Sequence, residues 1–474
     1  MPPSDSDHWA LQRHPELPRD LPLETGEILS CRKVLRQLPG RRLVCAGRWR
    51  DKRVVAKVFM GRRAARKAAR ERQGAYALEA AGIPAPKLLL ESAAEPQGWP
   101  VLLFEHLDHP VTLGELWNHG GEAREGLLQE LLELVARQHR AGLVQTDLHP
   151  DNFLLTGDGK LWAVDAGGYR HRKRALTLEE SIDNLGMLFA QFPRATLKGH
   201  LEVLDRYAAL RGFQPKVLRR AVPAAADRWR RWRARHLADK AFRNCTEFLA
   251  YELADFRIHQ RRDLGKKRLT AWLAAGGLAP RPGDRMLKAG NSQTVWRSRI
   301  GDREVVVKRY NLRGPWQRLR RTLGGSRAAR AWRGAHLLRA FHIDTPRPLA
   351  YIEERSRGLL AGRSWLITDW VAGQPAHQAL VPDPTLEQID SLVETLRAFG
   401  DNGLVHGDMK ASNFILDNHR VWVIDLDSLS WPRWRWRARR GHRADIRRFL
   451  RNWEKKGLAE TMLLKSFRGR LAKA

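Results

Sequence analysis

Two short segments of this sequence place carboxylate and amide side chains at the same spacing. Residues 143–155 read L-V-Q-T-D-L-H-P-D-N-F-L-L, and residues 404–416 read L-V-H-G-D-M-K-A-S-N-F-I-L. In each segment an Asp precedes an Asn by five positions, and another Asp follows the next strand-like run. Oxygen ligands of these types suit hard divalent cations, and a carboxylate in a loop can accept a proton from a hydroxyl group. A repeat of this length and order is improbable by chance, so the two segments are copies of one motif whose side chains could serve such chemistry.

The recurring polar positions keep the same order in both copies. They are Asp147, Asn152 and Asp165 in the first copy and Asp408, Asn413 and Asp425 in the second. Upstream, a β-branched run holds a single lysine in each copy: Lys57 lies in R-V-V-A-K-V-F, and Lys308 lies in E-V-V-V-K-R-Y. Such a run is typical of a β-strand, and a buried strand rarely holds a lone lysine without a functional reason.

Helices and strands of the same order must position these residues in both copies. Each lysine strand is followed by a helical pattern that ends at I-P-A-P (83–86) or I-D-T-P (343–346), because proline disfavours the helical conformation in the preceding residue. A second amphipathic helix precedes each Asp motif, and in the second copy the spacing of Thr385 and Gln388 predicts a capping box at its start. The internal repeat predicts an α+β protein with two similar modules.

These residues resemble the protein-kinase-like superfamily, and more narrowly the bacterial lipopolysaccharide core kinases, the Kdo and heptose kinase group that includes InaA-like proteins. The narrower resemblance rests on V-V-V-K-R-Y-N, T-P-R-P-L-A, H-G-D-M-K-A-S-N and V-I-D-L-D, at residues 305–311, 345–350, 406–413 and 423–427. The resemblance covers most of the chain. It implies tandem bilobal folds, each with an antiparallel β-sheet in the N-lobe and a mainly helical C-lobe.

The domain boundaries follow from the positions of the two copies. Module 1 is expected over residues 1–275, with its N-lobe at about 25–105 and its C-lobe at about 106–273. Module 2 is expected over residues 284–474, with its N-lobe at about 284–370 and its C-lobe at about 371–474. The linker is placed at about 274–283, where Gly and Pro cluster in A-A-G-G-L-A-P-R-P-G.

The resemblance implies a role for each polar residue of the Asp motifs. Asp147 and Asp408 would be catalytic, orienting the acceptor hydroxyl and accepting its proton. Lys410 and His149 would provide a cation or a hydrogen-bond donor beside the transferring phosphate. The ligands of Mg²⁺, which would arrive with ATP, would be Asn152, Asp165, Asn413 and Asp425.

The nucleotide-binding elements differ between the copies. Lys57 and Lys308 would hold the α and β phosphates of ATP, and in kinases a helix Glu orients this lysine through an ion pair. Glu71 occupies that position in the first copy, whereas the second copy has Ala331. The first copy in turn has Gln and Thr at 145–146 where the second has His and Gly. Each copy therefore departs from the kinase pattern in a different element.

Other elements of the kinase pattern are degenerate in both copies. The Gly-x-Gly-x-x-Gly loop is absent, which leaves Gly40 and Gly290 as the candidate turns over the nucleotide. Sugar kinases and nucleotide-free pseudokinases both show such degeneracy, so both alternatives stay open. Asp183 and Asp445, on the helix after each module's last Asp, are candidates either to support the catalytic loop or to cap a helix.

Composition limits the partners and the compartment. The chain has 474 residues with a formal net charge of +33, and 43% hydrophobic residues are enough to build packed cores, which excludes a disordered polycation. The three cysteines (Cys31, Cys45 and Cys245) cannot form a closed disulfide framework, which favours a reducing compartment. Residues 1–20 lack a secretory pattern, and no apolar run reaches the roughly 20 residues of a membrane span. The expected location is the cytoplasm, with peripheral contact at the cytoplasmic face of the inner membrane.

Trp and Arg alternate at residues 229–235 and 431–440. Arginine binds phosphate through its forked guanidinium, and indole rings favour the membrane interface, so an anionic phosphorylated glycolipid is the expected partner. A solvated basic face is the alternative. Nucleic acid would also be attracted by the charge, but the chain holds no DNA- or RNA-binding motif, and nucleic acid ranks below lipid.

The sequence thus predicts an ATP- and Mg²⁺-dependent kinase that phosphorylates a heptose or Kdo hydroxyl of the lipopolysaccharide inner core. Two alternatives stay open: a protein kinase or small-molecule phosphotransferase, and a pseudokinase scaffold in cell-envelope assembly. Either module is a candidate for the active one.

Overall fold

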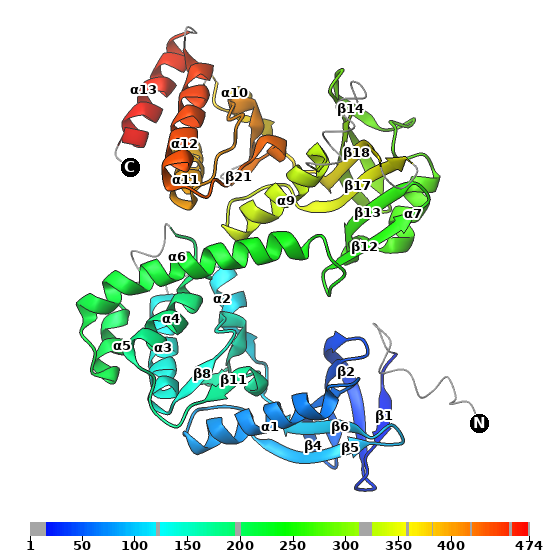
Figure 1. Ribbon diagram of the computed structural model, residues 1–474, viewed down its shortest axis with the longest axis vertical. Coiled ribbons are helices and arrows are strands. Elements are labelled where there is room, and N and C mark those ends of the chain that lie inside the picture. The colour runs from blue at the N-terminus through cyan, green and yellow to red at the C-terminus, as the bar shows by residue number, and fades with distance from the viewer. Residues whose placement is uncertain are drawn as a thin grey trace. The chain divides into compact units, whose positions relative to one another are not determined.

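The computed structural model divides into two compact units, residues 1–229 and 230–474. Both units combine antiparallel sheets with α-helices, which confirms the α+β class (Figure 1). Residues 1–15, which hold most of the segment without a secretory pattern, lie outside the described residues. The structure describes residues 16–119, 124–194, 201–311, 325–356, 360–381, 383–417, 420–454 and 457–472.

The first unit begins with a six-stranded antiparallel sheet in the order β1-β2-β3-β4-β6-β5. Val54, Ala56 and Val58 of β4 are buried in the core on one face of this sheet. Because successive side chains of a strand point to opposite faces, Lys57 lies on the other face. The elements are β1 (Arg19–Pro22), β2 (Ile28–Leu38), β3 (Arg42–Trp49), β4 (Lys52–Phe59), α1 (Ala64–Ala80), β5 (Leu88–Ala94) and β6 (Trp99–Glu105).

The rest of the first unit is mainly helical. A separate core holds the short strands in place, with Leu131 and Val135 of α3 and Phe153 of β9 fully buried. The elements are β7 (Val111–Thr112), α2 (Leu113–His119), α3 (Arg124–Arg140), β8 (Leu143–Gln145), β9 (Phe153–Leu155), β10 (Leu161–Ala163), β11 (Tyr169–His171), α4 (Leu178–Phe189), α5 (Leu204–Arg211) and α6 (Pro215–Lys240), with 3₁₀ turns η2 (Pro150–Asn152) and η3 (Ala166–Gly168).

The second unit begins with a seven-stranded antiparallel sheet in the order β12-β13-β17-β18-β16-β15-β14. Its last five strands repeat the order of β5-β6-β4-β3-β2 in the first unit, and two further strands extend the edge at β17. The elements are β12 (Phe248–Leu253), β13 (Phe256–Arg261), α7 (Lys266–Ala274), β14 (Arg285–Ala289), β15 (Gln293–Ile300), β16 (Arg303–Tyr310), α9 (Arg327–Ala340), β17 (Pro348–Ser356) and β18 (Leu360–Asp369), with the 3₁₀ turn η5 (Arg262–Leu264).

The division between the units differs from the expected linker at 274–283. Residues 230–273, which were expected in the first C-lobe, belong to the second unit. The reason is that β13 pairs with β17 along residues 256–260, and Leu269 and Trp272 of α7 are buried in the core of that sheet. The Gly- and Pro-rich stretch is therefore a turn inside the second unit, and the division falls within α6.

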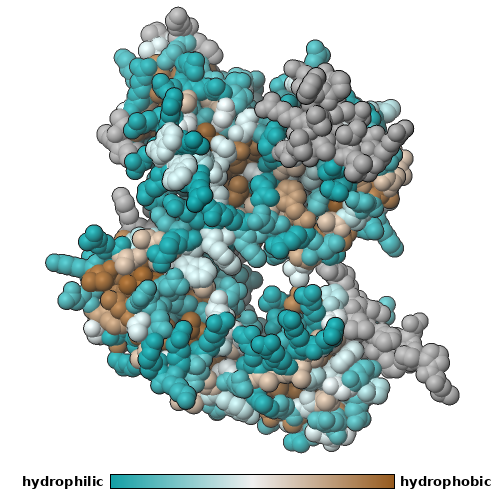
Figure 2. Space-filling view, viewed as in Figure 1, coloured by the Kyte–Doolittle hydropathy of each residue, from teal (hydrophilic) through white to brown (hydrophobic). Residues whose placement is uncertain are grey.

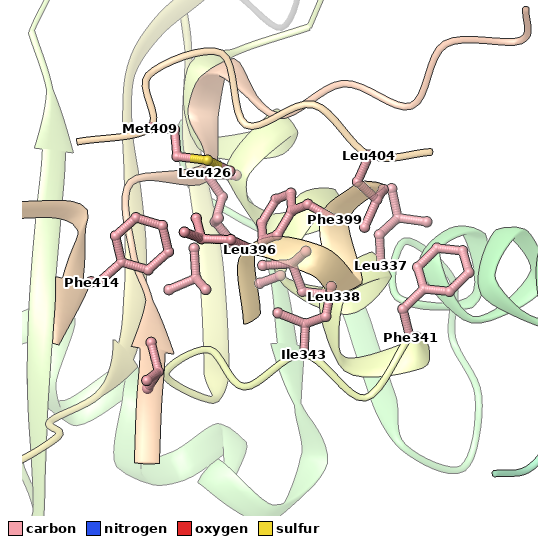
Figure 3. Packing of buried hydrophobic residues seen from close by; sticks show 14 of the residues in the cluster. Leu337, Leu338, Phe341, Ile343, Leu396, Phe399, Leu404, Met409, Phe414 and Leu426 are labelled. Atoms are coloured by element: carbon pink, nitrogen blue, oxygen red, sulfur yellow. The ribbon is translucent and has the colours of Figure 1, made fainter. Parts of the chain in front are cut away.

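The remainder of the second unit is helical apart from a small three-stranded sheet. Its core joins α9 to the C-terminal elements: Leu338 and Ile343 pack with Leu396 and Phe399 of α11 and with Phe414 of β20 (Figure 3). The elements are β19 (Gln374–Pro375), α10 (Ala376–Ala379), α11 (Leu386–Asn402), β20 (Phe414–Asp417), β21 (Arg420–Val423), α12 (Arg435–Leu450) and α13 (Leu458–Ala472), with 3₁₀ turns η6 (Ala411–Asn413), η7 (Leu426–Ser428) and η8 (Arg451–Trp453).

Hydrophilic residues cover most of the face drawn in Figure 2, and hydrophobic residues form separate patches there. The packed cores agree with the expectation that the chain folds and is not a disordered polycation. Among the described residues, no helix combines the length and the apolar composition needed to cross a membrane.

Candidate functional site

In the first unit, the lone strand lysine meets a helix glutamate. Lys57 Nζ on β4 donates to Glu71 Oε1 on α1, and the Glu71 side chain is only 2% exposed. The ammonium also lies 5.0 Å from the centre of the Phe104 ring. The pair therefore holds the lysine at a fixed place on the face of the sheet that is directed away from the β-strand core.

The Lys57–Glu71 pair lines a cavity of about 600 Å³ in the first unit. Asn152 and Asp165 line the same cavity, together with apolar side chains from the sheet. Asp165 adopts the left-handed conformation with φ 60°, which is uncommon outside glycine and often marks a functional position. Arg42 Nη1 lies 3.6 Å from Asp165 Oδ1. One cavity thus brings together a lysine, a glutamate, an amide and an aspartate that are far apart in sequence.

Asp147 lies in the loop between β8 and η2, and it is exposed and outside the lining of this cavity. Asn152 Nδ2 donates to the backbone oxygen of Asp147 at 2.7 Å, which ties the two motif residues together. The neighbouring Thr146 donates to the oxygen of Gly168 from its backbone N (2.9 Å) and its hydroxyl (2.8 Å). His149 caps η2, where its Nδ1 accepts from the backbone N of Asp151 at 3.2 Å.

The loop of the first unit is supported by a residue that sequence reasoning missed. Asn184 Nδ2 of α4 donates to the oxygen of Gln145 at 2.9 Å, and Asn184 Oδ1 lies 2.9 Å from His139 Nε2. His139 is fully buried, and burial lowers its pKa to about 4, so the ring is neutral. Asp183, one of the two residues considered for this role, instead accepts from Trp229 Nε1 at 3.1 Å.

The position of Asn184 could have been predicted from an interval that both copies share. Asn184 follows Asp147 by 37 positions, and Asp445 follows Asp408 by the same interval. Asp445 does contact its loop: its carboxylate accepts from the backbone N of His406 at 2.7 Å and of Gly407 at 3.1 Å. An interval of 37 positions from the loop Asp therefore locates the supporting residue in both units.

In the second unit, the strand lysine has a different partner. Ala331, which replaces the glutamate, is buried on α9, and Lys308 Nζ donates to Asp425 Oδ1. Burial opposes ionisation of Asp425, but the Lys308 ammonium and its hydrogen bond outweigh burial and hold the pKa of this carboxyl at about 2. Asp425 also has a left-handed backbone, with φ 62°.

A second ion pair lies beside Lys308 and Asp425. Arg327 of α9 pairs with Asp427, which is 6% exposed. The pKa of Asp427 is raised by burial and further by the nearby Asp425 carboxylate, while Lys308 and Arg327 oppose this rise. The V-I-D-L-D motif therefore places two carboxylates in one partly buried cluster, each with its own cation.

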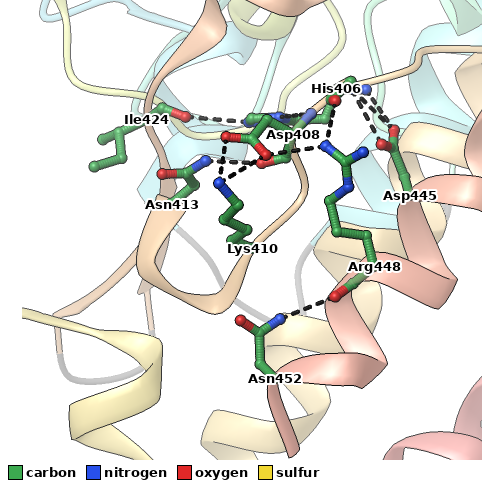
Figure 4. A network of polar contacts seen from close by, with 9 residues as sticks. His406, Asp408, Lys410, Asn413, Ile424, Asp445, Arg448 and Asn452 are labelled. Carbon is green, nitrogen blue, oxygen red and sulfur yellow. Dashed lines mark hydrogen bonds and ion pairs between the residues drawn. The ribbon is translucent and has the colours of Figure 1, made fainter. Parts of the chain in front are cut away.

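The catalytic-type loop of the second unit is held from several sides (Figure 4). Arg448 Nη1 of α12 donates to Asp408 Oδ1 at 3.0 Å, and Lys410 Nζ donates to Asp408 Oδ2 at 3.1 Å. Asn413 Nδ2 donates to the backbone oxygen of Asp408 at 2.7 Å, as Asn152 does for Asp147. His406 is fully buried and its Nε2 lies 3.1 Å from the oxygen of Ile424. Burial lowers the pKa of His406.

The two loops differ for a steric reason. Gly407 has φ +82°, and a Cβ added there would lie 2.8 Å from the oxygen of Ser428. Only glycine suits that backbone, so the Thr146 of the first unit belongs to a different loop path, anchored on Gly168. The remaining candidates lie in turns: Gly40 between β2 and β3, and Gly290 between β14 and β15.

The donor sets suit a magnesium ion that arrives with a nucleotide. Among the described residues, no three His, Cys, Asp or Glu side chains surround a metal position. Each unit instead offers the carboxylate of Asp165 or Asp425 together with the amide of Asn152 or Asn413. Because the amide Nδ2 donates to the loop backbone, its Oδ1 is left to act as a ligand. Mg²⁺ commonly binds through one or two protein carboxylates, substrate phosphates and water.

Comparison with known proteins agrees with this geometry. The model of the lipopolysaccharide kinase (Kdo/WaaP) family matches residues 48–198 and 283–465. The first segment lies in the first unit and the second in the second unit, and each contains one copy of the recurring Lys, Asp, Asn and Asp. No curated protein matches the chain.

Proposed function

Because the chain belongs to the lipopolysaccharide kinase (Kdo/WaaP) family, we propose that it uses ATP to phosphorylate a heptose or Kdo hydroxyl of the lipopolysaccharide inner core. We further propose that each unit is a bilobal kinase-like module. The observation that carries the proposal is the pair of Lys57 and Glu71 on a cavity that also holds Asn152 and Asp165.

The first unit is the proposed site of nucleotide binding. Its cavity of about 600 Å³ falls in the range of small-ligand pockets. Apolar side chains such as Val44, Val55 and Phe104 offer a surface for a purine, and Lys57 offers a cation for phosphate oxygens. Glu71 keeps this cation oriented, which matters because phosphoryl transfer depends mainly on positioning and charge neutralisation.

Asn152 and Asp165 are the proposed magnesium ligands. Bound Mg²⁺ would neutralise charge on the nucleotide phosphates. Asp147 is the proposed acceptor of the hydroxyl proton, since its carboxylate is exposed and its backbone is fixed by Asn152. His149, at the start of η2, is the proposed hydrogen-bond donor to the transferring phosphate.

The acceptor is proposed to be anionic and located at the cytoplasmic face of the inner membrane. The formal charge of +33 favours an anionic partner over a cationic one. A protein or another small molecule is the alternative acceptor, and the same carboxylate and lysine chemistry would serve it.

A second function is proposed for the second unit, as a pseudokinase module that supports the first. The ion pair of Lys308 with Asp425 favours this, because the lysine has no helix glutamate and neutralises the carboxylate that would otherwise bind a cation. Asp408 is likewise engaged by Lys410 and Arg448. The corresponding Asp147 of the first unit is exposed.

The test is transfer of the labelled γ-phosphate of Mg-ATP to purified inner-core lipopolysaccharide. Asp147→Asn is expected to abolish labelling, whereas Asp408→Asn is expected to retain most of it. Loss of labelling in Asp408→Asn alone would move the transfer to the second unit. Bound ATP with no labelled glycolipid, while a protein or small-molecule acceptor becomes labelled, would replace the proposed acceptor.

A further inference from the structure

Arginine supplies half of the residues that line a concave surface in the second unit. This surface has a volume of about 1450 Å³ and lies among α11, α12 and α13, which lie side by side in Figure 1. Asp401 is the single acidic residue of its lining. We name it the arginine cavity, and its arginines are Arg397, Arg435, Arg439, Arg440, Arg443 and Arg447.

The arginines of α12 face the cavity because of their spacing. Arg435, Arg439, Arg443 and Arg447 follow one another at four-residue intervals, which places them along one side of the helix. Like charges at this spacing repel each other. All four are exposed, and within the described part of the chain none has an ion-pair partner. The lining thus holds six arginines against a single carboxylate, that of Asp401.

The start of α12 adds to this excess of positive potential. Its first turn carries arginines and no acidic residue, and its N-cap residue Trp434 makes no side-chain cap. The helices α4 and α11 of the same chain start instead with capping boxes and acidic residues. Cations at a helix N-terminus oppose the helix dipole, whereas an anion is stabilised there. An anion in the arginine cavity would therefore reduce the repulsion among the arginines and also their unfavourable interaction with the helix dipole.

Exposed tryptophans at the same place favour a membrane as the source of that anion. Trp436 lines the cavity and Trp434 precedes it, and their side chains are 58% and 54% exposed. Arg437 and Arg433 lie 5.2 and 5.6 Å from the centres of these rings. Indole rings partition to the headgroup level of bilayers, and guanidinium groups bind phosphate in a bidentate manner. Ile446 and Leu471 add apolar side chains to the lining of the cavity.

We propose that the arginine cavity binds the phosphate headgroups of anionic phospholipids and docks the second unit on a bilayer. This inference deepens the proposed function at the membrane face and rests on it. The same helix holds the second unit's loop through Asp445 and Arg448, so docking would fix α12 next to Asp408.

The test measures sedimentation of the full chain with vesicles, without ATP or lipopolysaccharide. Wild-type protein is expected to bind vesicles of phosphatidylcholine mixed with phosphatidylglycerol, and to bind pure phosphatidylcholine vesicles weakly. The triple variant R439Q/R443Q/R447Q is expected to lose about 100-fold in affinity for the anionic vesicles, since each arginine near an anionic surface contributes about fivefold.

A matched control removes the same charge elsewhere. Lys216, Arg220 and Lys267 are exposed, and K216Q/R220Q/K267Q is expected to weaken binding by less than about threefold, because these residues lie outside the cavity. Equal losses in both triple variants would overturn the site, since net charge alone would then explain binding. A third variant, W434A/W436A, is expected to weaken binding to anionic vesicles while keeping the charge; unchanged binding would remove the tryptophans from the proposal.

Two further outcomes separate this inference from its alternatives. If a DNA duplex binds tightly, loses affinity only in R439Q/R443Q/R447Q, and anionic vesicles bind no better than neutral ones, the cavity is a nucleic-acid site and the lipid proposal fails. If vesicle binding fails in the wild type while lipopolysaccharide is still phosphorylated, the docking site fails and the proposed function stands. If vesicle binding depends on the arginine cavity but lipopolysaccharide is not phosphorylated, the docking site stands and the proposed function fails.

Discussion

Replacing Glu71 by Ala is expected to destabilise the first unit and weaken its nucleotide binding. Glu71 is 2% exposed and the Lys57 side chain 15% exposed, so the substitution leaves a partly buried ammonium without its carboxylate. Breaking a fully buried pair in this way costs about 3–5 kcal/mol. Lys57 borders an open cavity where water can solvate it, which reduces the expected cost to about 2 kcal/mol.

Scanning calorimetry with and without Mg-ATP measures both effects. For a unit of this size, about 2 kcal/mol corresponds to a melting temperature lowered by about 4–8 °C. Mg-ATP is expected to raise the melting temperature of the wild type, and this rise should shrink in Glu71→Ala because the lysine is no longer oriented. Glu71→Gln keeps a hydrogen-bond acceptor. Its melting temperature and its response to Mg-ATP should therefore lie between those of the wild type and Glu71→Ala.

The neighbouring ion pair supplies a matched control. Arg72, the next residue of α1, pairs with Glu91 at 2.6 Å, but their side chains are 37% and 44% exposed. Glu91→Ala should therefore cost only about 0–1 kcal/mol and leave the response to Mg-ATP unchanged. If Glu71→Ala melts like Glu91→Ala and keeps the full response to Mg-ATP, the pair with Lys57 does not organise the nucleotide site.

Further predictions concern the second unit. Gly407→Ala should lower its stability by about 1–3 kcal/mol in urea denaturation, because the added Cβ meets backbone at a positive φ, whereas Gly469→Ala, with open space around it, should not destabilise. Asp445→Ala should cost about 2–4 kcal/mol by leaving two backbone N–H groups without an acceptor, and Asp445→Asn should cost less; equal costs would contradict this. The pKa of Asp425 is depressed to about 2, so its ion pair stabilises the fold above pH of about 4 and is lost as pH falls towards 2. Lys308→Met should flatten the acid limb of the stability curve over that window, and an unchanged acid limb would show that the pair contributes nothing.

The elements around the recurring residues were largely predictable because their signals are local. The capping box of Thr385 and Gln388 occurs as expected at the start of α11, since cap and partner are three residues apart. Lys57 and Lys308 lie in β4 and β16, as the β-branched runs indicated.

Contacts between residues far apart in the sequence were harder to predict. Ala331 showed that Lys308 lacks a helix glutamate, but only the structure shows Asp425 as its partner. The contact of Arg448 with Asp408 could not be predicted, because Arg448 is one arginine among many on a basic helix and no sequence pattern distinguishes it.

The family, the α+β class and the order of the recurring residues in two copies could all be predicted from the sequence. These depend on intervals and on neighbours close in the chain, which the sequence displays directly. The folded structure was needed to show where the units divide, which cation neutralises each carboxylate, and that the arginines of α12 border a cavity. Each of these results from contacts between segments far apart in sequence, such as β13 with β17, and their free energy depends on packing that no local pattern records.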